Sequence, residues 1–205
     1  ILDGGTLHGV GRYGGSALVG AVFKVGTNGT GFVTTKSFNY SDTVYPAAGV
    51  VTAGANLCGT TLSGGSGLGA VYRIGTNGTG YTTVLNFNQA NGAYPLGELL
   101  AVGNMLYGAT ANGGSGKYGT LYRVNADGTG YKALKNYTHA NGGTPNGSLI
   151  TSGNMIYGTT RYGGSGGGGT VFKCTTNGTG YVVLKNFPAA TYSYTYVVSK
   201  AGIIL

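Results

Sequence analysis

Charged side chains are scarce in this chain of 205 residues, at 8%, and it has no tryptophan, four prolines and two cysteines. Two cysteines cannot form the disulfide framework that holds small secreted domains together. No apolar run approaches the ~18 residues that a membrane-spanning helix needs. With 41% hydrophobic residues, the chain is also too apolar for a disordered tail. These scarcities leave a globular chain whose fold depends on packing.

Glycine and tyrosine are the abundant residues, at 44 and 17 copies. The glycines follow no three-residue period, which excludes collagen, and they suit turns and close backbone approaches. No segment shows a helical period, whereas tyrosine favours strands. The formal charge of +8 reflects only four acids rather than a dense run of basic residues. We therefore expect an all-β protein and no nucleic-acid partner.

A single period of about 50 residues runs through the chain. It relates four short tetrads of the form (Leu/Ile)-x-Gly-x, which begin at Leu7, Leu57, Leu106 and Ile156. It also relates the first glycines of four (N/D)-G-T-G turns, which are Gly29, Gly78, Gly128 and Gly178. The repeats occupy approximately residues 1–44, 45–93, 94–143 and 144–191.

Each repeat is predicted to be a four-stranded antiparallel meander. In the third copy the short apolar runs are 98–102, 105–110, 119–124 and 131–137. Two hairpin turns are indicated by Gly103-Asn104 and Asp127-Gly128, the latter because a type I′ turn needs positive φ at both central positions. Four such units at this period predict a β-propeller of four blades.

The two ends of the chain lack a complete unit. Only Ile1-Leu2 stands where the first strand of the first repeat belongs, while residues 192–205 fall at the phase of a fifth first strand. We expect this extra strand to complete the first blade and close the ring. Alternatively the chain is a piece of a longer array, or the strand inserts into a neighbouring copy and builds a filament. The residues expected to form it are Tyr194, Tyr196, Val197 and Val198.

The recurring pattern L-Y-G-(A/T)-T…G-G-S-G…G-T-(V/L)-(F/Y)-(K/R)…(N/D)-G-T-G-Y…L-K-N-F…P resembles the GloVer-type (Gloeobacter/Verrucomicrobium) tandem repeat over residues 6–187. The resemblance implies a secreted or surface-displayed bacterial repeat protein. It implies no enzymatic activity and supplies no catalytic residues.

No catalytic or metal-binding constellation stands out. The four acids are Asp3, Asp42, Glu98 and Asp127. They occupy non-equivalent positions, so they do not indicate the carboxylate pair of a glycosidase. The histidines and cysteines are His8, His139, Cys58 and Cys174. Their spacing is not that of a zinc site, and both cysteines replace apolar strand residues, so we expect buried, inert thiols. The sequence predicts no enzyme, no metal and no cofactor.

Two sets of side chains are candidates for binding. One cation per repeat falls at the same place in the third strand, where the set either gathers an anion or serves only solubility: Lys24, Arg73, Arg123 and Lys173. Aromatic and basic residues also recur in the glycine-rich loops, where tyrosine faces can stack on sugars or merely suit a sheet. These are Arg12, Tyr13, Tyr118, Arg161 and Tyr162.

The sequence as a whole predicts a non-enzymatic structural or adhesive protein, extracellular or at the cell surface, that assembles with copies of itself. The alternative is a lectin-like propeller whose partner is a surface polysaccharide. The two hypotheses differ in their expected partner, and neither includes a membrane span.

Overall fold

The computed structural model describes residues 1–64 and 67–189. Strands form nearly all the regular structure, and the one short 3-10 helix of the described part is η1 (His139–Asn141), so His139 opens this turn. The all-β prediction is confirmed. The predicted C-terminal strand lies outside the described residues, as do Tyr194, Tyr196, Val197 and Val198.

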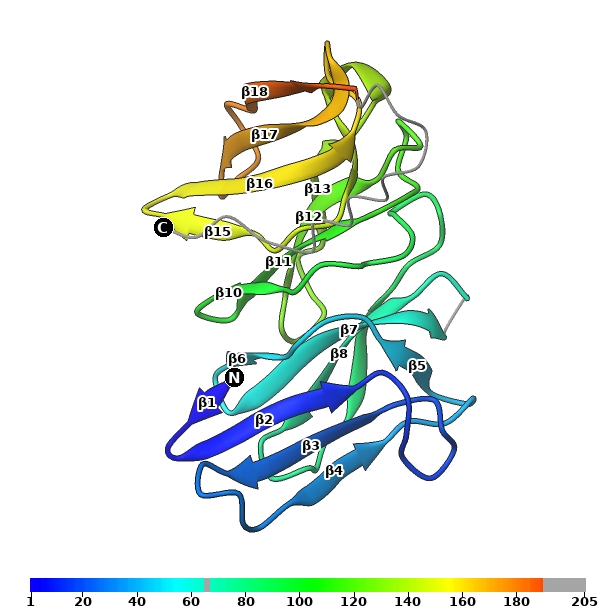
Figure 1. Ribbon diagram of the computed structural model, residues 1–205, viewed down its shortest axis with the longest axis vertical. Helices are drawn as coiled ribbons and strands as arrows, with labels where there is room; N and C mark the ends of the chain where they lie inside the picture. Colours follow the sequence, from blue (N-terminus) through cyan, green and yellow to red (C-terminus); the bar gives the residue numbers. More distant parts are fainter. Residues whose placement is uncertain (65–66, 190–205) are drawn as a thin grey trace.

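Four antiparallel sheets, here called blades 1 to 4, follow one another along the molecule (Figure 1). Blade 1 contains β1 (Leu2–Asp3), β2 (Thr6–Gly11), β3 (Ala21–Gly26) and β4 (Val33–Ser37). Blade 2 contains β5 (Thr43–Pro46), β6 (Val51–Ala53), β7 (Asn56–Gly64), β8 (Ala70–Gly75) and β9 (Thr82–Asn86). Blade 3 contains β10 (Leu100–Val102), β11 (Met105–Thr110), β12 (Thr120–Asn125) and β13 (Lys132–Asn136). Blade 4 contains β14 (Gly143–Pro145), β15 (Ile150–Ser152), β16 (Met155–Tyr162), β17 (Gly167–Thr175) and β18 (Val182–Pro188).

The first strand of a blade is divided in blades 2 and 4, a feature that the sequence did not predict. In blade 2 both β5 and β6 pair with β7, and in blade 4 both β14 and β15 pair with β16. In blade 1 the short β1 corresponds to β6, because Leu2 faces Leu7 as Thr52 faces Leu57. The stub predicted at the N-terminus therefore forms a strand of its own.

The turns between the third and fourth strands follow local side-chain chemistry. In blade 2 the Asn77 Oδ1 atom accepts hydrogen bonds from the Thr79 N–H at 3.0 Å and from its hydroxyl at 2.8 Å, while Gly78 has a φ of 92°. In blade 3 Asp127 takes the place of the asparagine and accepts the same two bonds from Thr129. These bonds stabilise the carboxylate and hold the pKa of Asp127 below its ordinary value.

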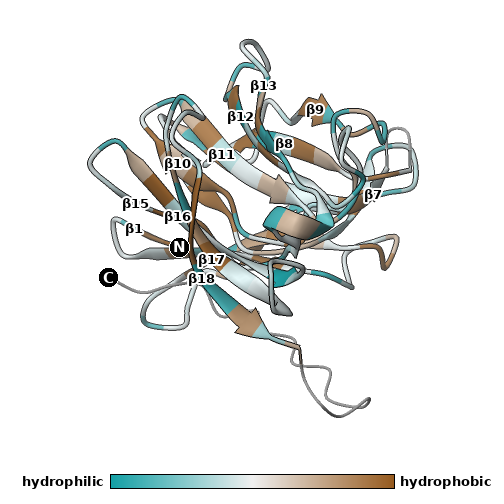
Figure 2. Cartoon of the chain, turned by 90° about the horizontal axis from the view of Figure 1, so that it is seen from above, coloured by the Kyte–Doolittle hydropathy of each residue, from teal (hydrophilic) through white to brown (hydrophobic). Residues whose placement is uncertain are grey.

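The hydrophobic core lies between blades. One cluster joins blades 1 and 2, a second joins blades 2 and 3, and a third joins blades 3 and 4. Figure 2 shows hydrophobic stretches along the strands and hydrophilic stretches mainly in the surrounding loops. Since burying apolar surface is the main driving force of folding, each blade is stabilised chiefly by its neighbours.

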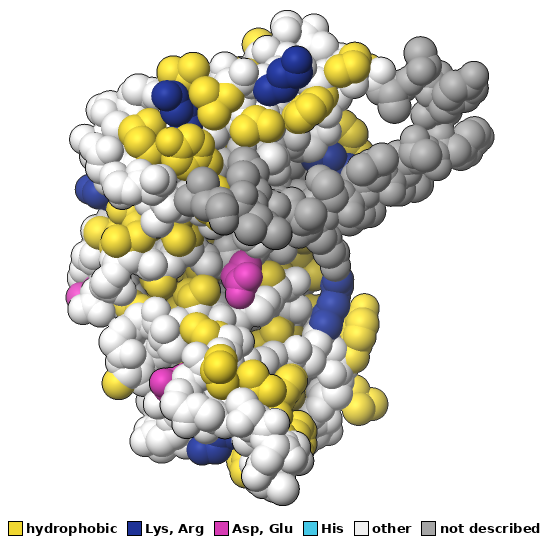
Figure 3. All heavy atoms as spheres, turned by 60° about the vertical axis from the view of Figure 1, so that its left-hand side comes forward, with side chains coloured by type: hydrophobic (Ala, Val, Ile, Leu, Met, Phe, Trp, Pro, Cys, Tyr) yellow, Lys and Arg dark blue, Asp and Glu magenta, His cyan; other side chains and the backbone are white. Residues whose placement is uncertain are grey.

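The surface carries few charges, and Figure 3 shows them scattered singly among uncharged and hydrophobic side chains. Lys36 and Asp42 form an ion pair of 2.7 Å, and the Lys36 ammonium also lies 4.5 Å from the centre of the Tyr81 ring. The described part of the chain contains no helix with the length and apolarity needed to cross a membrane.

Candidate functional site

Two pockets lie at opposite ends of the second strands of the blades. One, of about 440 Å³, lies where these strands end and is lined by residues that follow β2 and β11. We call it the tyrosine groove, and its lining residues are Arg12, Tyr45, Leu62, Ser63, Tyr94, Leu96, Ala111, Asn112 and Thr144. The other, of about 620 Å³, lies where β2 begins and β3 ends.

The links between blades position the tyrosine groove. Tyr45, Tyr94 and Thr144 occupy equivalent positions immediately before a proline, and all three have left-handed φ values of 59°, 57° and 52°. Non-glycine residues rarely adopt this conformation, and a β-branched threonine does so least readily. The backbone N–H of Tyr45 donates to the Val19 carbonyl at 2.8 Å, and equivalent bonds hold the other two residues. Each residue is therefore fixed to a loop of the preceding blade.

An aromatic and basic cluster stands at one side of the groove. The ring centres of Tyr13 and Tyr45 are 5.9 Å apart, and the Arg12 guanidinium carbon lies 5.8 Å from the centre of the Tyr13 ring. A side-chain hydrogen bond with Tyr40 raises the pKa of Tyr45. Tyr13 is 68% exposed and Tyr94 is 38% exposed, so both rings are accessible to solvent. The cluster offers flat apolar faces beside a fixed positive charge.

The structure brings only part of the predicted loop set to this groove. Arg12 lines it and Tyr13 adjoins it through Tyr45. The other three residues lie elsewhere: Tyr118 packs edge-on against His139 at 5.8 Å, and Arg161 lies over the Tyr162 ring at 4.8 Å. The set predicted from the sequence does not include Tyr45 and Tyr94, although each stands before a proline in successive repeats. The recurrence of this Tyr-Pro pair at the period of the repeat was the available indication.

The predicted row of cations is in register. Lys24 faces His8 across β2 and β3, Arg73 faces Cys58, Arg123 faces Tyr107, and Lys173 faces Tyr157. Lys24 and Arg73 nevertheless line separate pockets. Arg73 shares a smaller pocket of about 260 Å³ with Asn56, Asn104, Asn125, Ala126 and Asp127. These two cations therefore do not line one shared pocket.

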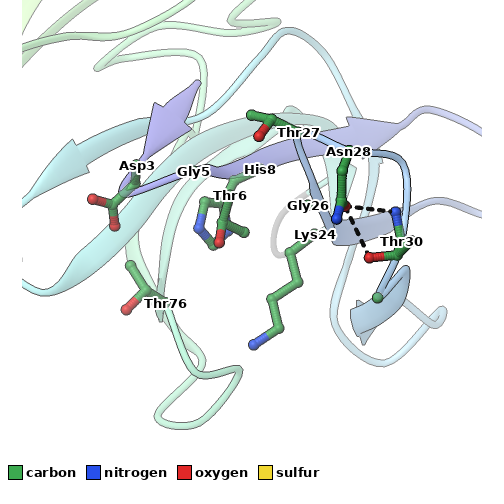
Figure 4. Close-up of a pocket in the computed structure, with 11 residues that line it drawn as sticks. Asp3, Gly5, Thr6, His8, Lys24, Gly26, Thr27, Asn28, Thr30 and Thr76 are labelled. Carbon is green, nitrogen blue, oxygen red and sulfur yellow. Dashed lines mark hydrogen bonds between the residues drawn. The ribbon is translucent and has the colours of Figure 1, made fainter.

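The pocket at Lys24 is lined mainly by polar side chains (Figure 4). Asp3, His8 and Lys24 lie in it with the Asn28 turn and with Thr76 from blade 2. His8 is 5% exposed, and its Nδ1 atom has no hydrogen-bond partner among the described residues. A small anion could accept bonds from the Lys24 ammonium here. The nearby carboxylate of Asp3 weakens that attraction, because like charges repel.

The two cysteines lie in the core and are not bonded to each other. Cys58 and Cys174 are free thiols with 0% and 1% exposure, and burial raises the pKa of each to about 11. Because a thiol is nucleophilic as its thiolate, the raised pKa disfavours the reactive form of both residues at neutral pH. Residues 1–64 and 67–189 hold no group of three or more His, Cys, Asp or Glu side chains able to bind a metal.

Solved structures similar to this chain are β-propeller proteins. A chain of the nidogen/laminin complex matches with a TM-score of 0.60 and 15% identity, covering 82% of this chain and 58% of its own. TolB from Acinetobacter baumannii matches with a TM-score of 0.59 and 17% identity, covering 88% and 40% respectively. A putative TolB from Agrobacterium tumefaciens matches with a TM-score of 0.60 and 11% identity, covering 89% and 62%. The chain thus has the blade architecture of a propeller and spans less than two thirds of these proteins.

The family comparison rests on sequence rather than on shape. No curated protein matches the chain. The family model of the Gloeobacter/Verrucomicrobia repeat matches residues 98–202, about half of the chain, and this segment includes most of the third repeat and all of the fourth. The remaining repeats share the same landmarks at the same spacing. The chain belongs to the Gloeobacter/Verrucomicrobia repeat family.

Proposed function

We propose that this chain is a non-enzymatic adhesive protein of the cell exterior, and that the tyrosine groove binds carbohydrate. One observation carries the proposal: Tyr45 and Tyr94, 49 residues apart in sequence, are fixed in the same strained backbone conformation and line one groove with Arg12. Strained non-glycine residues cluster at binding sites, where the surrounding fold holds them in place. Repetition of this device in successive blades supports a shared role.

The chemistry of the groove suits sugars. Tyrosine rings present flat apolar faces to the C–H faces of a pyranose, and Asn112 and Ser63 offer side-chain groups that can bond hydroxyls. Arg12 can form a bidentate pair with a carboxylate. With a formal charge of +8 on the whole chain, we propose an acidic polysaccharide as the preferred ligand, since a basic protein attracts polyanions.

The proposal is tested by calorimetric titration with an acidic polysaccharide, a uronate polymer, and with a neutral glucan at two salt concentrations. Tyr94→Ala should weaken binding to the uronate polymer at least tenfold, whereas Arg12→Ala should remove the preference for uronate over glucan. Tyr162→Ala is the matched control, because Tyr162 is an exposed tyrosine outside the groove.

Three outcomes would contradict this assignment. Equal losses from Tyr94→Ala and Tyr162→Ala would place binding in the glycine-rich loops generally. Binding that vanishes at high salt in every variant alike would show charge attraction without a site. Turnover of the polymer, detected as new reducing ends or unsaturated products, would replace adhesion by an enzymatic role.

A further inference from the structure

The blades are joined by aromatic rings that recur at each boundary. A ring just after the fourth strand of one blade meets a pair of rings in the next blade. Phe38 lies 5.2 Å from Tyr72 and 5.9 Å from Tyr81, measured between ring centres. We call the first residue the inserted ring and the other two the ring pair. At the first boundary the inserted ring is completely buried.

The other two boundaries repeat this arrangement. At the second, the inserted ring Phe87 lies 5.3 Å from Tyr122, which stacks with Tyr131. At the third, the inserted ring Tyr137 lies 5.6 Å from Phe172 and 6.0 Å from Tyr181. Phe87 and Tyr137 are both 0% exposed. The same three-ring contact therefore forms each time two blades meet.

One inserted ring and one ring pair are left over. Phe187 occupies the inserted-ring position in blade 4, yet it is 42% exposed and contacts no aromatic ring among the described residues. In blade 1 Phe23 and Phe32 form a ring pair at 5.7 Å, but Phe32 is 63% exposed. The two halves of a fourth contact thus lie on opposite ends of the row of blades (Figure 1).

Leucine side chains near these rings are also exposed on the end blades and buried at the internal boundaries. Leu7 of blade 1 is 41% exposed, although its equivalents Leu57 and Leu106 are completely buried against a preceding blade. On blade 4, Leu184 is 47% exposed whereas its equivalent Leu134 is 9% exposed. Two apolar faces remain uncovered by the described residues, and each has the composition of a face that is buried elsewhere in the same molecule.

We infer that the blade 4 face of one copy packs against the blade 1 face of a second copy, with Phe187 inserted at the Phe23–Phe32 pair. A second copy is the partner that fits, because each internal boundary joins an inserted-ring face to a ring-pair face and a second copy supplies the missing one. Such a contact is head-to-tail, so copies either close into a ring or continue as an open stack. This inference does not depend on carbohydrate binding.

Sedimentation velocity over a wide range of protein concentration tests the inference with the full chain. The unmodified protein should associate as its concentration rises. Phe32→Asp and Phe187→Asp should each raise the dissociation constant at least a hundredfold, because each places a charge in the apolar contact. Val102→Asp is the matched control: Val102 is 44% exposed on β10 of blade 3, away from both faces, and should leave association unchanged.

Mixing the two variants gives the decisive result. Phe32→Asp retains an intact blade 4 face and Phe187→Asp an intact blade 1 face, so an equimolar mixture should form a dimer with one interface and grow no further. A protein that stays monomeric at every concentration would overturn the inference. So would variants that associate normally, or a mixture in which the two variants form no mixed dimer. Circular dichroism checks the fold, and Phe32→Asn and Phe187→Asn are the milder replacements.

Discussion

The Tyr131 hydroxyl donates a hydrogen bond of 2.8 Å to the backbone carbonyl of Asn91, a residue 40 positions earlier in the preceding link. The equivalent bond from Tyr181 to the Asn141 carbonyl is 2.9 Å long. In blade 2 the equivalent Tyr81 instead shares a 2.8 Å hydrogen bond with the Thr43 side chain. The tyrosine of each N-G-T-G-Y or D-G-T-G-Y turn thus anchors the link between blades as well as packing in a boundary.

Tyr131→Phe should lower the free energy of unfolding by about 1 kcal/mol, because it removes one half-buried hydrogen bond and little packing. Chemical denaturation of the variant and the unmodified protein measures the difference. Tyr162→Phe, which removes an exposed hydroxyl, is the control and should change nothing. Equal effects from both replacements would contradict the role given to the Asn91 bond.

Tyr122→Phe should have the opposite effect and raise the free energy of unfolding. The Tyr122 side chain is completely buried, and its hydroxyl has no hydrogen-bond partner among the described residues. An unpaired buried hydroxyl is costly, and the equivalent positions of blades 1 and 4 hold Phe23 and Phe172. We expect the free energy of unfolding of the variant to be about 1 kcal/mol higher than that of the unmodified protein. A loss of stability in the same denaturation assay would reveal a partner for this hydroxyl.

Gly59→Ala should destabilise the fold by about 1–3 kcal/mol through overpacking. A Cβ atom at Gly59 would lie 2.5 Å from the Tyr72 hydroxyl oxygen, and the Tyr72 ring is locked in the boundary with blade 1. Gly9→Ala is the matched change in blade 1, where the Cβ atom would lie 2.6 Å from the Phe23 ring. Because no preceding blade covers that ring among the described residues, the ring can move, and the destabilisation measured by thermal unfolding should be smaller. Equal costs would refute this explanation.

Cys58 and Cys174 should resist alkylation by iodoacetamide in the native protein and react once it is unfolded. Burial raises both thiol pKa values from 9.0 to about 11, so folding favours the neutral thiols. Their contribution to stability is complete below pH 9 and is lost as the pH rises towards 11. Mass spectrometry follows the labelling, and rapid modification of the folded protein would show that these thiols are accessible.

The hairpins could be predicted from the sequence because their determinants are local. Asn77-Gly78 specifies its turn through hydrogen bonds within three residues. The same turn motif recurs in every repeat and made the period visible in the sequence. The tyrosine groove could not be predicted in the same way. It depends on how Tyr45 and Tyr94 are held by loops of the preceding blades, and no short segment encodes that stacking. The divided first strand escaped prediction for a related reason, since β5 contains the left-handed Tyr45.

Because each core lies between two blades, blades 2 and 3 are each held by two cores and blades 1 and 4 by one within the described residues. Repeat proteins coupled only to their nearest neighbours do not melt as a single unit. Amide hydrogen exchange should therefore be slowest in β8 and β12 and fastest in the end blades. Rising denaturant should erode the row from both ends, and a partner that covers one end would protect the blade at that end.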